Sequence, residues 1–168
     1  MRTAGVIVAC AAGMGCMVGT AEISDSELDE ATLDRVVSYQ GLPRINAQPY
    51  TSELGPFAIN CYVAGDVADY RKIHPEQRDA NVTVAPGTVI VREVSDTAGQ
   101  VTKLTVMAKG PSGYDPSLGD WMFAVTDPRG APLEENGALL IGRLTQCHDC
   151  HRERSHDDFL FGVPGSDI

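Results

Sequence analysis

The feature that most constrains the fold is a series of four segments rich in β-branched and aromatic residues in the middle of the chain. Each is bounded by glycine, proline, aspartate or serine, which is typical of strands separated by turns. Residues 95–100, between the second and third segments, are short enough for a hairpin, so we expect those two strands to pair antiparallel. The predicted strands span residues 57–63, 88–94, 101–108 and 121–126.

Helical patterns lie before these segments. Ser24 and Glu27 have the spacing of a capping box, and apolar residues from Leu28 to Val37 follow at near-helical intervals, so we expect one amphipathic helix that ends at Gly41. Residues 42–56 contain three prolines and predict a connecting loop.

Further turns and helices are predicted between and after the strands. Residues 66–74 predict a short helix, and residues 127–130 predict a turn. After Asn136-Gly137 we expect the C-terminal helix to begin, because Leu139, Leu140 and Leu144 have helical spacing. The fold class is therefore α+β, an antiparallel β-sheet with an N-terminal helix and a C-terminal helix.

The N-terminus has the pattern of a secretory signal peptide. Arg2 is followed by an apolar, uncharged run up to Ala21, and the first acidic residue is Glu22. Cleavage after residue 21 would leave residues 22–168 as a single domain in the periplasm or outside the cell. Gly15-Cys16 also fits the acylation point of a bacterial lipoprotein, so lipid anchoring at Cys16 stays an alternative. A membrane span is a weaker alternative, because the run is short and rich in glycine.

The charge of the expected mature chain excludes some partners. Without residues 1–21 the chain keeps 12 lysines and arginines against 23 acidic residues, a formal net charge of −11. Such a surface argues against nucleic acid and against anionic membranes as partners. A basic redox carrier would suit it, although an acidic balance by itself often serves only solubility.

Residues 147–151 read Cys-His-Asp-Cys-His, which is the attachment pattern of a c-type haem. The thiols of Cys147 and Cys150 can add to the haem vinyl groups as thioethers, and the neighbouring His151 can serve as the proximal iron ligand. One haem c per chain is therefore predicted.

The same motif has two other possible uses. A thioredoxin-like dithiol would follow a strand at a helix start, whereas here a helical run is expected to lead into the motif. A structural zinc site would need four ligands, of which His148 and His151 could supply two. The remaining cysteine of the mature chain, Cys61, is expected to pack as a buried apolar residue in a strand.

At this point the chain resembles the cytochrome P-460 family, whose relatives include the β-sheet type of cytochrome c-prime. The resemblance covers about half of the mature chain. It rests on residues 86–93, 107–109, 114–116 with 119–121, the haem motif, and 158–161, in that order. It implies an antiparallel sheet packed on haem, often as a homodimer. It also implies hydroxylamine oxidation, with nitric oxide chemistry close by.

The family haem is cross-linked to a lysine, and the matching position of this sequence holds Arg92. Arginine stays protonated and is a poor nucleophile, so we expect an unmodified c-type haem at this position. Glu93, the next residue, is expected to point to the opposite face of the sheet.

Other side chains have two interpretations. Lys103, Met107 and Lys109 share one strand face, and we expect the lysines to face solvent. Met107 and Met122 could ligate iron or fill the core. His74 and His156 are expected at the surface, with iron ligation an alternative for His156. Trp121 and Phe123 are expected in the core.

Three functions follow from these features. The first is an open iron site that binds nitric oxide, hydroxylamine or carbon monoxide, with electrons passed to a soluble redox carrier. Without the family lysine, binding is favoured over turnover. The second is an electron carrier with six-coordinate iron, using Met107, Met122 or His156 opposite His151. The third is a sensor, or a degenerate member of the family it resembles, that holds haem without turnover.

Overall fold

The computed structural model describes residues 25–52, 55–73, 75 and 80–164. The expected signal peptide, including Cys16, the capping pair's Ser24 and His74 all lie outside the described residues. Within the described part, no helix is long and apolar enough to cross a membrane.

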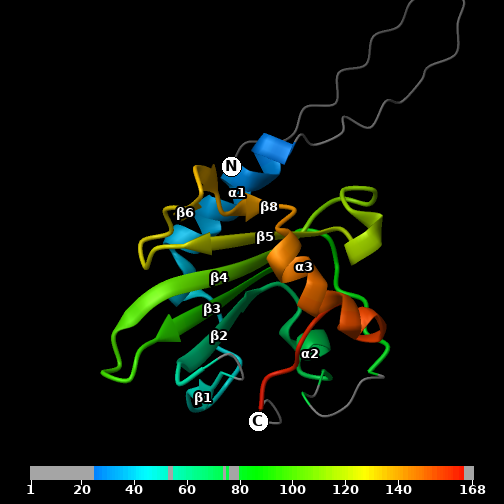
Figure 1. Ribbon diagram of the computed structural model, residues 1–168. Coiled ribbons are helices and arrows are strands. Elements are labelled where there is room, and N and C mark those ends of the chain that lie inside the picture. The colour runs from blue at the N-terminus through cyan, green and yellow to red at the C-terminus, as the bar shows by residue number, and fades with distance from the viewer. Residues whose placement is uncertain (1–24, 53–54, 74, 76–79, 165–168) are drawn as a thin grey trace, which may run out of the picture.

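A six-stranded antiparallel sheet forms the centre of the molecule (Figure 1). The four predicted strands are confirmed, with ends shifted by no more than one residue. Two short strands complete the sheet at its edges. In sheet order the strands are β1 (Tyr50–Thr51), β2 (Ala58–Ala64), β3 (Val89–Ser95), β4 (Val101–Lys109), β5 (Trp121–Thr126) and β8 (Ile141–Gly142).

The predicted hairpin joins β3 and β4. The Asp96 carboxylate accepts hydrogen bonds from the backbone of Ala98 and Gln100, each at 2.9 Å, which holds the turn. Val91 pairs with Val106, Arg92 with Thr105 and Ile90 with Met107. This register decides which side chains share each face of the sheet.

Helix α1 (Asp25–Val37) covers one face of the sheet. Val36 is fully buried there, against a layer that includes Val91, Leu104 and Val106. The predicted helix is confirmed, but it ends at Val37, and a separate 3₁₀ turn, η1 (Tyr39–Gly41), follows.

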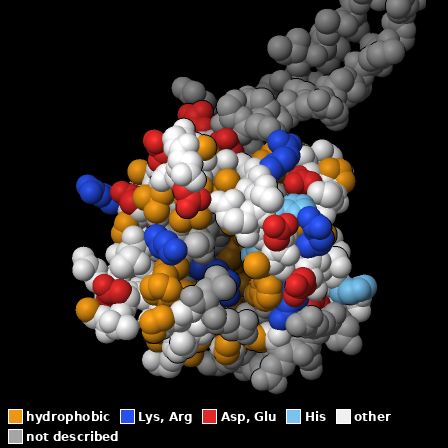
Figure 2. All heavy atoms as spheres, viewed as in Figure 1, with side chains coloured by type: hydrophobic (Ala, Val, Ile, Leu, Met, Phe, Trp, Pro, Cys, Tyr) orange, Lys and Arg blue, Asp and Glu red, His pale blue; other side chains and the backbone are white. Residues whose placement is uncertain are grey.

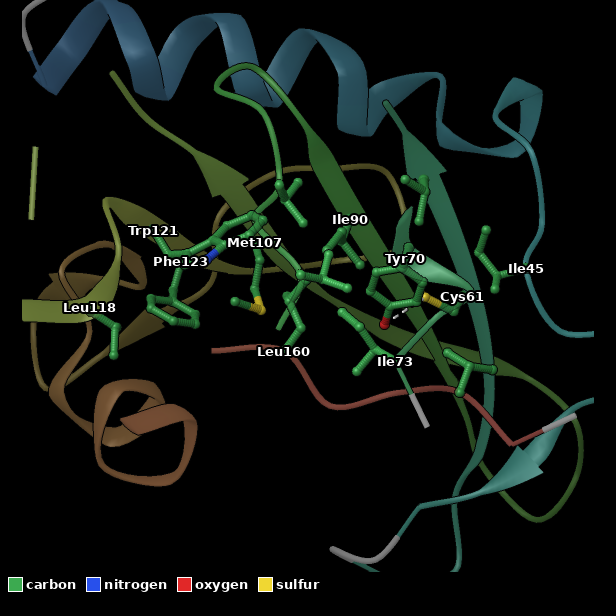
Figure 3. Close-up of a cluster of buried hydrophobic side chains, with 14 residues drawn as sticks. Ile45, Cys61, Tyr70, Ile73, Ile90, Met107, Leu118, Trp121, Phe123 and Leu160 are labelled. Atoms are coloured by element: carbon green, nitrogen blue, oxygen red, sulfur yellow. Dashed lines mark hydrogen bonds between the residues drawn. The ribbon is translucent and has the colours of Figure 1, made fainter. Parts of the chain in front are cut away.

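The other face of the sheet carries a second core cluster (Figure 3). Trp121, Phe123 and Met107 lie toward one end of this layer, and Tyr70 and Cys61 lie toward the other. Three short helical segments lie on this side of the sheet: helix α2 (Val67–Tyr70), helix α3 (Thr145–His151) and the 3₁₀ segment η3 (Arg152–Asp157). The expected core positions of Trp121 and Phe123 are confirmed.

The apolar run before the motif does not form a helix, contrary to expectation. Asn136 and Gly137 both have positive φ, at 52° and 80°, and make the two-residue turn of a hairpin between β6 (Glu134–Glu135) and β7 (Ala138–Leu139). Leu139 is 57% exposed, and Leu140 hydrogen-bonds Leu133 and Val125. The motif helix α3 begins only at Thr145, because the turn signal and the pairing of β5 with β8 take precedence over the helical spacing.

Candidate functional site

A cavity of about 310 Å³ lies between the second face of the sheet and α3. This volume is at the lower end of the range for sites that bind small organic molecules. The space-filling view shows a hollow near the middle of this side of the molecule, surrounded mainly by hydrophobic side chains with Lys and Arg atoms beside it (Figure 2). The cavity therefore opens where the motif helix faces the sheet.

Helix α3 brings three of the four residues predicted to bind the cofactor to the cavity, and the fourth, Arg92, lines it from the sheet. Cys147, Cys150 and His151 stand at positions i, i+3 and i+4, which share one side of a helix. All three line the cavity, and both cysteines are free thiols. The single turn that carries the motif is thus enough to present two thiols and an imidazole together.

The imidazole of His151 is held in one orientation. Its Nδ1 lies 2.6 Å from the carbonyl oxygen of Phe159, a geometry in which Nδ1–H donates. Burial lowers the pKa of His151 to about 4, against the raising effect of this hydrogen bond, and the charge of Arg92 lowers it further. The ring is therefore neutral near pH 7, and its second nitrogen, Nε2, keeps a lone pair for a metal.

The carbonyl that orients His151 belongs to a strained segment. Asp158 and Phe159 both have positive φ, at 51° and 63°. The ring of Phe159 lies against Gly119, where a Cβ would be only 2.7 Å from it. A side chain at position 119 would therefore collide with the Phe159 ring, which belongs to the segment that holds His151.

A buried ion pair ties this segment to the sheet. Lys109 Nζ lies 2.6 Å from Asp158 Oδ1, and both side chains are 8% exposed. The other carboxylate oxygen accepts from the backbone of Val84, and Trp121 Nε1 donates to the Asp158 carbonyl. The expectation that Lys109 faces solvent is therefore wrong, because a carboxylate distant in sequence compensates its charge.

The sheet forms the opposite wall of the cavity. Arg92 on β3 lies beside Thr105 on β4, and Lys103 and Met107 flank Thr105 on the same face. Lys103 is half-buried and lines the cavity, so the expectation of a solvent-facing lysine is wrong here as well. Glu93 points to the α1 face, as expected, and hydrogen-bonds Tyr39 and Asn60 there.

Arg92 makes its side-chain hydrogen bonds to one phenol. Its Nε and Nη2 donate to the hydroxyl oxygen of Tyr50 at 3.1 and 2.8 Å. Tyr70, which also lines the cavity, donates to the Phe161 carbonyl at 3.0 Å. Tyr50 and Tyr70 were not singled out from the sequence, because only the pairing of distant segments places them beside Arg92.

The structure separates the candidates for a second iron ligand. Met107 lines the cavity and is 8% exposed. Met122 is fully buried in the α1 layer, on the other face of the sheet. His156 is exposed, as expected, and does not line the cavity. Of these three residues, Met107 alone shares the cavity with His151.

Cys61 is buried, as predicted, and its thiol contacts the hydroxyl of Tyr70 at 3.7 Å (Figure 3). Burial raises its pKa, which is typical of an unreactive core cysteine.

The structure also bears on the two other uses of the motif, as a redox dithiol and as a zinc site. Cys147 stands in the first turn of a helix after strand β8, so the sequence-based objection to a redox dithiol does not hold. Burial, followed by the charge of Cys150, raises the pKa of Cys147 to about 11, whereas redox-active pairs lower it. For zinc, no group of three His, Cys, Asp or Glu side chains suited to a metal ion occurs among the described residues.

Comparison with models of known protein families, and a search of the curated proteins, gave no match for this chain.

Proposed function

We propose that this chain is an exported single-haem c-type cytochrome, similar to cytochrome P-460, with an iron site open to nitric oxide or related small nitrogen compounds. The observation that carries the proposal is the shared cavity of Cys147, Cys150 and His151, with the His151 ring held through Nδ1. Resemblance to the family supplies the ligand class and the homodimer.

The residues around the cavity suit a haem. Cys147 and Cys150 would hold it as thioethers, and Nε2 of His151 is the nitrogen left for iron. Ile90, Met107, Phe123 and Leu160 supply an apolar wall. When bound, haem would supply an iron that takes up small ligands and exchanges electrons. Phe159 keeps the imidazole oriented, and Arg92 replaces the family lysine without its nucleophilicity.

The observation that favours an open site is the packing of Met107. Its cross-strand neighbours are Ile90 on one side and Phe123 on the other, and the three belong to one buried cluster. The observation that favours the alternative, a six-coordinate electron carrier, is that Met107 lines the wall opposite α3. The distinction therefore depends on this single thioether.

The deciding measurement is the ferrous absorption spectrum of the full chain, co-expressed with haem-attachment machinery, before and after nitric oxide is added. An open site gives a high-spin spectrum that changes on addition. A sharp low-spin spectrum that ignores nitric oxide would contradict the open site. If Met107→Leu then made that spectrum high-spin, the electron-carrier alternative would be supported.

Matched variants test the haem itself. We expect His151→Ala to change the spectrum and His156→Ala, an exposed histidine, to leave it unchanged. Cys150→Ala should leave at most one thioether, whereas Cys61→Ala should keep both. Unchanged haem content and spectrum in the two motif variants would refute a c-type haem here, and a haem-peptide mass that showed a bond to Arg92 would refute the unmodified haem.

A further inference from the structure

The sheet wall of the cavity carries two cationic side chains on neighbouring strands. Arg92 lies in the middle of β3, and Lys103 lies on β4, two positions before the residue paired with Arg92. Both line the cavity and are only partly exposed. Arginine presents a planar fork of donors that matches two oxygen atoms of an anion.

Neither cation has an acidic partner in the described part of the chain. No aspartate or glutamate among the described residues lines the cavity. The nearest acid in sequence, Glu93, is on the opposite face, where Tyr39 and Asn60 hold it. Asp158, at the end of the same sheet face, is already paired with Lys109. Among the residues that the structure describes, positive charge thus accumulates on one wall without an acidic partner, an arrangement that costs free energy unless an anion supplies the balance.

The neighbouring phenols and thiol do not supply that negative charge. Burial raises the pKa of Tyr50, Tyr70 and Cys61, so all three are neutral at physiological pH. Tyr50 accepts hydrogen bonds from Nε and Nη2 of Arg92, whereas Nη1 donates to no acceptor within the described residues. Part of the guanidinium is therefore held in place, and part is left for a ligand.

We infer that Arg92, assisted by Lys103, forms a binding site for a planar oxyanion on the sheet wall of the cavity. Two sources have this chemistry: a propionate of a haem held by α3, or a diffusible anion of nitrite type. The inference deepens the proposed function, and its connection to iron rests on that function. Anion binding itself requires only the cavity.

The test uses the full chain purified with whatever cofactor it carries. Thermal unfolding midpoints are measured against sodium nitrite, with sodium chloride at the same ionic strength as the reference. The midpoint potential of any haem is measured in the same samples. The variants are Arg92→Gln, Arg92→Lys and Lys103→Gln. Arg129→Gln is the matched control, because it removes the same charge from a side chain that is 93% exposed.

For a diffusible anion, nitrite raises the unfolding midpoint of the wild type more than chloride does. Arg92→Gln then weakens nitrite binding by about tenfold or more, because a charged hydrogen bond is lost. Lys103→Gln weakens it less, and Arg129→Gln has no effect. For a haem propionate, any effect of nitrite on the wild type persists in Arg92→Gln, as expected of nitrite bound at iron. Arg92→Gln then lowers the midpoint potential, since a nearby cation disfavours ferric iron. Arg92→Lys recovers part of either effect.

The inference is overturned if Arg92→Gln leaves the nitrite effect of the wild type unchanged, or the wild type shows none, and Arg92→Gln moves the potential no more than Arg129→Gln. A chain that binds no haem would refute the proposed function, yet a nitrite-specific shift lost in Arg92→Gln would still establish the anion site. If Arg92→Gln does not fold, the nitrite titrations of the wild type and of Arg92→Lys test binding of a diffusible anion. The midpoint potential of Lys103→Gln then tests binding of a haem propionate.

Discussion

The two faces of the sheet bury charge in opposite ways, and adjacent residues of β3 show the contrast. On the α1 face, the Glu93 carboxylate accepts from Tyr39 at 2.7 Å and from Asn60 at 2.9 Å. On the cavity face, Arg92 donates only to Tyr50 within the described residues. On the first face the charged group has its hydrogen-bond partners within the protein, whereas on the second the Arg92 charge has no acidic partner among the described residues. One face therefore serves stability, and the other leaves part of its stabilisation to a binding event.

The largest loss of stability is expected at the buried ion pair of the cavity face, between Lys109 and Asp158. Lys109→Met leaves Asp158 buried without its cation, and we expect a loss of about 3–5 kcal/mol in denaturant unfolding. Asp158→Asn in the same chain should recover much of it, because asparagine tolerates a positive φ and the buried charge is gone. A loss below about 1 kcal/mol in the single variant would show that this ion pair does not hold the segment.

Truncating one large side chain on each face compares their packing. Leu104 is fully buried under α1, and Leu104→Ala should cost about 3 kcal/mol in denaturant unfolding. Met107→Ala should cost about 2 kcal/mol, because it only enlarges a cavity that already exists. Equal costs in the haem-free chain would mean that the cavity face is packed as tightly as the other.

A smaller difference in stability is expected between variants of Glu93 and of Arg92, the two charged residues of β3. Glu93→Ala should lower the free energy of unfolding by about 2 kcal/mol, because Tyr39 and Asn60 lose their acceptor. Glu93→Gln, which keeps an acceptor, should cost less. Arg92→Gln in the absence of added anions should leave stability unchanged or increase it, since an uncompensated charge is removed. If Arg92→Gln is as damaging as Glu93→Ala, the contrast between the faces is wrong.

The smallest effect is a dependence on alkaline pH. Burial, together with the hydrogen bond to Glu93, raises the pKa of Tyr39 to about 12, above its ordinary value of 10. The unfolded chain therefore loses this proton first, so stability falls as the pH rises from about 10 to 12. Tyr39→Phe should make that fall shallower in circular dichroism titrations. Other buried tyrosines keep part of the dependence, and an unaltered slope would contradict the role of Tyr39.

The sequence predicted the parts of the fold that depend on local pattern. The four strands and the first helix follow directly from residue type and spacing. The spacing of Leu139 and Leu140 predicts a helix, although the same residues also fit a β-hairpin. The hairpin forms because Asn136 and Gly137 adopt positive φ and the run pairs with strands from other parts of the chain.

The candidate site was predictable only where its residues are neighbours in sequence. Cys147, Cys150 and His151 stand within one turn, and alternation placed Arg92 and Glu93 on opposite faces. The partners of Lys109 and Arg92 could not be predicted, since Asp158 and Tyr50 are 49 and 42 residues away. Burial of a lysine depends on such a distant carboxylate, which no local pattern reveals.

The same long separations set an order in time. Tyr70 and Phe161 are bonded across 91 residues, Lys109 and Asp158 across 49, and the hairpins of the sheet across far fewer. Because closing a longer loop costs more conformational entropy, we expect the hairpins of the sheet to form before the segment behind His151 is fixed. In the finished protein the Cys147 thiol is already partly enclosed. We therefore expect a group to be joined to Cys147 more readily while the chain is still open than after folding is complete.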